Sequence, residues 1–194
     1  MRAPLTLILL LLNLAAFALE MRSGDAFVTQ YALWPYGRGF APLQLLSSGF
    51  LHANLLHLGS NMLGLWMFGR EVERALGSTR FALLYFASLL SAALTQLLVV
   101  SGMAETTPTV GASGAVFGVL MAFAMLFPRR IIVLLFPPIP MPAWLFVLLY
   151  AAFELYAGVH GTFSGVAHFA HLGGLLGAWL LMRGWRRRVV RSWY

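Results

Sequence analysis

The chain has 194 residues, of which 60% are hydrophobic and only 10% are charged, so a soluble domain would have too little polar surface. The formal net charge of +7 comes from arginines that stand at the ends of apolar runs, which argues against a nucleic-acid partner. Without cysteine, the chain can form no disulfide, no thiolate nucleophile and no cysteine metal site. The composition therefore predicts a protein whose first partner is the lipid bilayer.

Six apolar runs are long enough to cross a hydrocarbon core of ~30 Å, which takes about 20 helical residues. Since an open sheet edge cannot lie in lipid, each run is predicted to be a helix. The predicted fold class is all-α: a polytopic membrane protein with six transmembrane helices in a single domain, residues 1–194. The runs cover about 3–19, 50–69, 80–100, 111–127, 143–159 and 168–184.

The first run has a second interpretation, because Arg2, a leucine-rich core and Ala16-Phe17-Ala18 are also typical of a cleaved signal peptide. We favour a retained helix. With a cytoplasmic N-terminus, eleven arginines lie on the cytoplasmic side and two, Arg22 and Arg38, lie outside, which fits the positive-inside rule. Both termini are then cytoplasmic, and the short chain without soluble domains favours a bacterial cell membrane.

The second run places His52, His57, Ser60 and Asn61 among leucines. Polar side chains in a membrane span usually face a cavity or the interior of the bundle. His57 and Asn61 are four residues apart, so they lie on one face of the helix, one turn from each other.

The fourth run opens with Ser113 between Gly111 and Gly114. Glycine removes side-chain bulk, so a substrate backbone can approach the hydroxyl and the local amide groups. A second interpretation is helix packing, since Gly114 and Gly118 form a GxxxG pair. Partners elsewhere in the chain must decide between the two.

The last two runs supply Glu154, His168 and His171. Counting from the arginines, Ser113, His57 and His171 lie ~24, ~20 and ~18 Å into the membrane, so they can converge. A serine hydroxyl needs a base to take its proton, and either histidine of the sixth run could be that base.

An oxyanion formed by attack of Ser113 needs hydrogen-bond donors. The Ser113 amide, the His57 ring and the Asn61 amide are the candidates, and Phe117, one turn after Ser113, can pack against the base. For Glu154 we expect a structural or gating role, because nothing in the sequence connects it to the serine.

Together, these residues resemble the rhomboid family of intramembrane serine proteases. The match consists of His52-x4-His57-x3-Asn61, Gly111-x-Ser113-Gly114 and Ala170-His171-x-x-Gly174, in this order and on the second, fourth and sixth helices. Gly69-Arg-Glu-Val-Glu-Arg-x-Leu-Gly77-Ser78 is also similar to the family's segment after the second helix, where we interpret Glu73 and Arg74 as structural.

The resemblance implies a Ser–His dyad that cleaves transmembrane protein substrates, with Ser113 as nucleophile and His171 as general base and acid. It implies no acidic third member, no cofactor and no metal. His57 and Asn61 match the family's oxyanion positions, and His52 is assigned support of the second helix or the adjoining loop. Gly111, Gly114 and Phe117 support Ser113, and Gly174 lets the sixth helix approach the fourth. His168 is assigned a structural role.

The chain departs from the family at two places. Many rhomboids carry Trp-Arg in the first loop, where this chain has Leu43-Gln44. Some rhomboids have tyrosine at the position of Phe117. The phenyl ring of Phe117 keeps the stacking surface and lacks the hydroxyl.

Three alternatives remain open. A catalytically silent rhomboid-like chaperone or binding protein should have lost Ser113 or His171, and both are present. A metal or haem protein could use the five histidines, but no His-Glu-x-x-His spacing occurs. A transporter should show paired broken helices and a repeat, and neither is evident.

Overall fold

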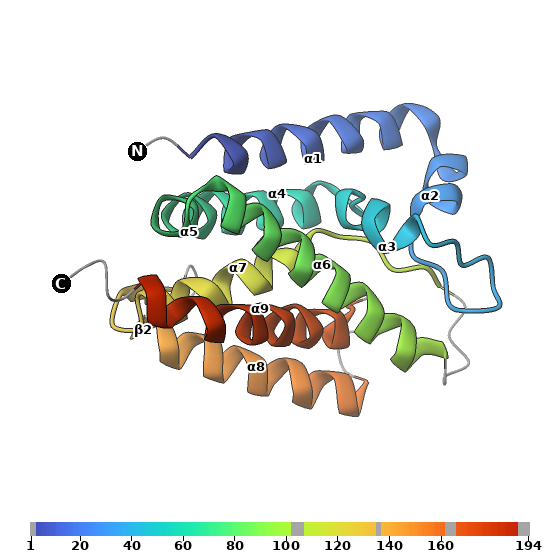
Figure 1. Ribbon diagram of the computed structural model, residues 1–194. Helices are drawn as coiled ribbons and strands as arrows, with labels where there is room; N and C mark the ends of the chain where they lie inside the picture. Colours follow the sequence, from blue (N-terminus) through green and yellow to red (C-terminus); the bar gives the residue numbers. More distant parts are fainter. Residues whose placement is uncertain (1–2, 102–106, 135–136, 162–165, 190–194) are drawn as a thin grey trace.

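The computed structural model describes residues 3–101, 107–134, 137–161 and 166–189, and most of these residues are helical (Figure 1). The longer helices are α1 (Pro4–Ser23), α4 (Leu55–Gly64), α6 (Ser78–Ser101), α7 (Ser113–Leu126), α8 (Ala143–His160) and α9 (His168–Val189). The short elements are α2 (Asp25–Tyr31), α3 (Gln44–Ser47), η1 (Ser48–Phe50), η2 (Leu65–Gly69), α5 (Arg70–Leu76), β1 (Ile131–Val133) and β2 (Pro140–Pro142). The prediction of an all-α membrane protein is confirmed.

Each of the six predicted apolar runs overlaps a helix. By length and composition, α1, α6 and α8 are able to cross a membrane. The second run is one helical path in which α4 passes through the π-helical turn η2 into α5. At 14 residues, or ~21 Å, α7 is shorter than a full span.

The helix α7 lies at the centre of the bundle, and this position explains its uniformly apolar sequence. Ten of its residues are buried, and α6 and α9 pack against it. On either side of this centre lie α1 and α8, where only 22% of the residues in each apolar window are buried (Figure 1). Both present leucines outward, including Leu7, Leu11, Leu148 and Leu155. Such faces suit lipid.

Glycines set the distance between α7 and α9. A Cβ atom added to Gly174 would collide with the backbone carbonyl oxygen of Gly114, so the two backbones are in direct contact. A Cβ on Gly118 would meet Ser88 of α6 and the carbonyl oxygen of Gly174. Small residues allow this close approach in membrane bundles. The packing interpretation of Gly114 and Gly118 therefore holds, and it brings two helices with predicted site residues together.

Glu73 joins three helices at the arginine-rich end. Its Oε1 accepts hydrogen bonds from the Leu5 amide at 3.0 Å and the Ser78 hydroxyl at 2.6 Å. Its Oε2 accepts from the Thr6 amide at 2.8 Å and the Thr6 hydroxyl at 2.7 Å. The first amides of a helix have no partner within that helix, so Glu73 caps α1 and also holds the start of α6.

Gln44 organises the long loop between α2 and α4. Its Oε1 accepts from the amides of Trp34 and Ala41 at 3.2 and 3.1 Å, and its Nε2 donates to the carbonyls of Gln30 and Gly39 at 3.3 and 3.2 Å. The side chain is 3% exposed. The departure from Trp-Arg thus places a neutral, fully paired amide at the centre of the loop.

A short antiparallel hairpin, which was not predicted, connects α7 to α8. Ile131, Ile132 and Val133 of β1 pair with Pro142, Met141 and Pro140 of β2. Proline cannot donate a ladder hydrogen bond and is tolerated only at a sheet edge, which explains why this sheet stops at two strands.

Candidate active site

Ser113 is the first residue of α7, and the segment before it is fixed at two residues, Thr109 and Gly111. Thr109 and Leu33 form an isolated antiparallel bridge with two hydrogen bonds of 2.9 Å. The Gly111 amide donates to the carbonyl of Ser48 at 2.9 Å. Gly111 has φ +132°, a conformation that favours glycine. The chain therefore enters α7 by one defined path, and the Ser113 amide is among the first-turn donors that have no acceptor within the helix.

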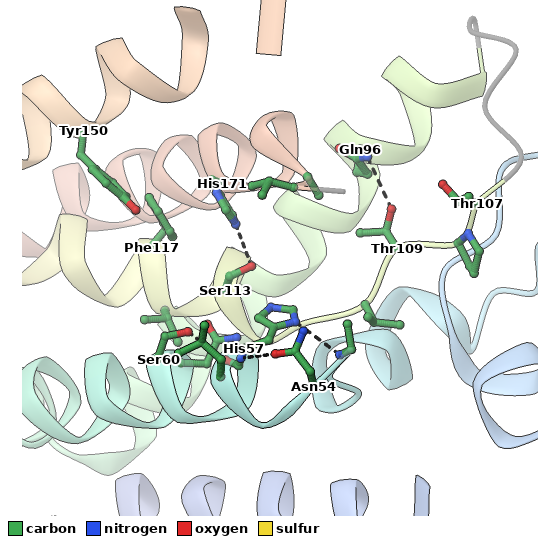
Figure 2. A pocket seen from close by; sticks show the side chains of 18 residues that line it. Asn54, His57, Ser60, Gln96, Thr107, Thr109, Ser113, Phe117, Tyr150 and His171 are labelled. Atoms are coloured by element: carbon green, nitrogen blue, oxygen red, sulfur yellow. Dashed lines mark hydrogen bonds between the residues drawn. The ribbon is translucent and has the colours of Figure 1, made fainter. Parts of the chain in front are cut away.

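The structure brings Ser113 and His171 together. Nε2 of His171, on α9, lies 2.8 Å from Oγ of Ser113 (Figure 2). Phe117 stacks on the imidazole with ring centroids 4.2 Å apart and planes 5° from parallel. Gly174 lies one turn after His171, where α9 touches α7. The close approach of the two helices therefore brings His171 within hydrogen-bond distance of Ser113.

His57 lies against Gly111, on the other side of the serine. A Cβ on Gly111 would lie 2.8 Å from both Cε1 and Nε2 of His57 and 3.5 Å from Oγ of Ser113. Only glycine leaves room for this ring. The Ala53 amide donates to Nδ1 of His57 at 3.4 Å, so Nε2 carries the proton and can donate it. Asn54 caps α4 by accepting from the His57 amide at 2.8 Å, which holds the residue in place.

Asn61 follows one turn later on α4. It is 5% exposed, it lines the same cavity as Ser113, and its Nδ2 has no hydrogen-bond partner among the described residues. A buried amide donor without a partner is costly, and such groups call for an explanation. At this place the donor is available to a bound molecule.

His52 lies behind His57 rather than in the cavity. It precedes α4, is 1% exposed, and meets the His57 ring edge-on at 5.1 Å between centroids. Its amide donates to Oε2 of Glu20 at 3.1 Å, which connects the start of this segment to α1. This position fits a supporting residue.

A cavity of about 710 Å³ opens beside the pair. Its polar lining includes Ser113, His171 and His57, which are labelled in Figure 2. Asn61 also lines it. Gln96 and Tyr150 also line it, and the sequence analysis missed both. Gln96 donates to the hydroxyl of Thr109 at 3.4 Å, and Tyr150 stacks on Phe117 with centroids 5.0 Å apart. Neither lies at a motif position, so only the tertiary contacts identify them.

Glu154 requires a correction. The sequence analysis left it unconnected to the serine and implied no acidic group beside the histidine, yet its Oε1 lies 3.1 Å from Nδ1 of His171. Its Oε2 lies 2.6 Å from Nδ1 of His168. The contact with His171 has ion-pair distance but not the alignment of a hydrogen bond. A comparison of depths in the sequence could have indicated this contact. Glu154 is the twelfth residue of α8, and His171 stands 12 residues before Arg183, so both lie equally far from the arginine-rich side.

The same three side chains are the candidates for a metal site among the described residues, with ligand atoms within 4.8 Å of one another. At 2.6 Å, however, Nδ1 of His168 is in a short hydrogen bond to the carboxylate. Metal ligation would require a deprotonated Nδ1 and would break this bond. The arrangement therefore suits hydrogen bonding rather than ligation.

The fold and the site together define a class of protein: a helical membrane protein with a serine–histidine pair at a polar cavity. A family model described as "Rhomboid domain" matches residues 40–188. The chain belongs to the rhomboid family, as the motifs predicted.

Several curated relatives are similar to the chain. Rhomboid protein 1, mitochondrial, of Saccharomyces cerevisiae is 36% identical over 169 residues, which are 86% of this chain and 49% of that protein. RHOMBOID-like protein 12, mitochondrial, of Arabidopsis thaliana is 33% identical over 67% of this chain and 42% of its own length. Rhomboid protease GlpG of Yersinia pestis is 34% identical over 44% of this chain and 31% of its own length. The chain thus spans about half or less of these relatives.

These relatives include mitochondrial and bacterial proteins. The family and the apolar helices support a membrane protein. A bacterial cell membrane with both termini cytoplasmic stays a prediction.

Proposed function

We propose that this chain is an intramembrane serine endopeptidase, which cleaves transmembrane proteins in or beside their membrane span. Ser113 is the nucleophile and His171 is the general base and acid. The observation that carries the proposal is the 2.8 Å contact between Nε2 of His171 and Oγ of Ser113 at the wall of a cavity of about 710 Å³. A nucleophile within hydrogen-bond reach of its base is the basic requirement for covalent catalysis by serine.

In the first half of the reaction, Oγ of Ser113 bonds to the scissile carbonyl carbon while its proton passes to Nε2 of His171. The carbonyl π electrons move to oxygen and form an oxyanion. When the C–N bond breaks, the nitrogen takes the proton from His171, and the acyl group stays on Ser113. Phe117, stacked on the ring, keeps Nε2 directed at the serine.

Three donors are placed to stabilise the oxyanion. The Ser113 amide lies at the N-terminus of α7, where the helix dipole favours negative charge. Nε2 of His57 lies across Gly111 from Oγ, and Nδ2 of Asn61 is unpaired within the described residues. Donors held in place before the reaction typically contribute the largest share of such catalysis.

The second half of the reaction needs water. A water molecule gives a proton to Nε2 of His171 and attacks the acyl carbon, and the proton returns to Oγ as the ester bond breaks. The cavity provides the space for this water and for an extended substrate segment. A substrate helix must unwind locally, because its carbonyls are already hydrogen-bonded.

The direct test is cleavage of a model transmembrane substrate in liposomes by the purified wild-type chain, Ser113→Ala and His171→Ala. Each substitution is expected to abolish cleavage and to leave membrane insertion intact. The matched controls are Ser23→Ala and His160→Ala, whose side chains are exposed on α1 and α8. A serine-directed fluorophosphonate should label the wild type in the presence of chelator and should not label Ser113→Ala. Cleavage by either site variant contradicts the proposal, and binding without cleavage by the wild type favours a silent binding protein.

A further inference from the structure

Glu154, His168 and His171 form a buried cluster, of which the proposed reaction uses only His171. The three side chains are 2%, 6% and 8% exposed, and Glu154 comes from α8 while both histidines come from α9. The carboxylate presents one oxygen to each ring, at 2.6 Å for His168 and 3.1 Å for His171. Charged side chains inside a membrane are expensive and usually functional.

We propose that Glu154 is a positioning residue, which orients His171 and stabilises the imidazolium that forms when His171 takes the serine proton, while His168 holds the carboxylate in place. This inference rests on the proposed function. It connects an acid on α8, Glu154, through a base on α9, His171, to a nucleophile on α7, Ser113.

Glu154 lies where it can set the tautomer of His171. Nε2 must accept the Ser113 proton, so in the neutral ring the proton is on Nδ1. Nδ1 lies 3.1 Å from Oε1 of Glu154. The carboxylate thus favours the tautomer that leaves Nε2 free to act as a base, as in other serine hydrolases with an acidic partner.

Glu154 also lies where it can stabilise a positive charge on His171. Once Nε2 is protonated, the ring carries a positive charge in a site of low polarity, and a carboxylate at 3.1 Å stabilises it strongly. The contact is not aligned as a hydrogen bond before the proton moves. The attraction is therefore greatest for the charged intermediate, and interactions of this kind accelerate the chemical step.

His168 is the residue that holds the Glu154 carboxylate in place. Its Nδ1 donates to Oε2 at 2.6 Å, and its ring is 86° from the plane of His171, so the two rings approach different oxygens. This hydrogen bond limits rotation of the carboxylate. It also joins α8 to α9. The structural role expected for His168 is thereby specified as a contact to one acid.

The groups around His171 on the other helices are mostly uncharged. The helix α7 presents Ser113 and Phe117, and α6 packs on α9 through Ser91 and Thr95. Among the described residues, the other titratable groups at the site are His57 from α4, which interacts electrostatically with His171, and Tyr150 from α8, which interacts with Glu154. Glu154 is the acid among them, so it is the group expected to stabilise a charged His171.

The test is the pH profile of kcat/KM for wild type, Glu154→Gln and Glu154→Asp with one model substrate. For Glu154→Gln we expect kcat to fall by at least about 10-fold with little change in KM, because the interaction acts on the reaction and not on substrate binding. The acid limb of the profile should move to lower pH, because an imidazolium without its carboxylate loses its proton more readily. Glu154→Asp keeps the charge and should restore much of the rate.

Glu73→Gln is the matched control, since Glu73 is an equally buried acid outside the cavity. It should lower stability without moving the acid limb. If Glu154→Gln does not fold, His168→Leu tests the same contact, and His168→Asn, whose amide can replace the Nδ1 donor, should restore the lost rate.

Three outcomes would overturn the inference. An unchanged rate and acid limb in Glu154→Gln, or a lower rate with an unmoved acid limb, means that Glu154 is only structural. His168→Asn behaving like His168→Leu also overturns it. In all three cases the wild type still cleaves, so the proposed function stands. A wild type that cleaves nothing overturns both.

Discussion

Two carboxylates of this chain are buried to nearly the same extent but have different surroundings. Glu73 is 1% exposed and Glu154 is 2% exposed. Glu73 accepts from two amides and two hydroxyls, none of which changes charge near neutral pH. Glu154 faces two imidazoles, and an imidazole can change its charge near neutral pH. Burial alone therefore does not indicate function, whereas the chemistry of the partners does.

The contrast extends to the two ends of the bundle. At the arginine-rich end, Glu73 satisfies donors from α1 and α6, so polar groups there contribute to stability. At the cavity end, Asn61 keeps a buried amide without a partner among the described residues. Such a group lowers stability and is retained where a ligand can use it. The following predictions test this division.

The largest effect is expected for Glu73→Ala. Removing the carboxylate leaves the buried amide of Thr6 and the partly buried amide of Leu5 without an acceptor, which should cost at least about 3 kcal/mol of unfolding free energy. The measurement is reversible unfolding in mixed micelles. The molecules that remain folded should cleave at the wild-type rate. A large loss of kcat in the folded fraction would contradict a purely stabilising role for Glu73.

Asn61→Ala should show the opposite pattern. We expect kcat/KM to fall by at least about 10-fold, because losing one oxyanion donor typically lowers kcat by ~100-fold or more. The unfolding free energy should stay the same or rise slightly, because the removed amide has no protein partner among the described residues. Cleavage and unfolding are measured on one preparation, with Asn54→Ala as a control that should destabilise the start of α4.

A smaller change should follow from Thr6→Val, which keeps the shape of the side chain and removes one hydroxyl donor to Glu73. The expected loss is about 1 kcal/mol of unfolding free energy with normal cleavage. Thr6→Ser retains the hydroxyl and serves as the control. If both variants unfold like the wild type, this hydrogen bond contributes nothing measurable.

The smallest effect is a dependence of stability on acid. Burial raises the pKa of Glu73, but hydrogen bonds from Ser78, Thr6 and Leu5 outweigh it and lower the pKa below 4.5. A lowered pKa in the folded state gives stability that is complete above pH ~4.5 and is lost as pH falls through the folded value. Glu73→Gln should lack this part of the acid dependence. Identical acid dependence in both proteins would contradict the assignment.

Much of the fold could be predicted because lipid restricts the choices so strongly. Long apolar runs must be helices, and the predicted runs overlap α1, α4, α6, α7, α8 and α9 within a few residues at most ends. The family was predictable because Ser113, His171 and the glycines around them occur at characteristic spacings. The hairpin of β1 and β2 was missed, since three-residue strands containing prolines carry no periodic signal.

The sequence by itself determined the helices and the residue types able to perform the chemistry, since both depend on local composition and spacing. Only the tertiary structure decided that Glu154 faces His168 and His171, that Gln44 organises the first loop, and that Gly111 admits His57. These contacts join segments that are distant in the chain or depend on one backbone angle. They depend on the distance between packed helices, and a hydropathy pattern carries no information about that distance.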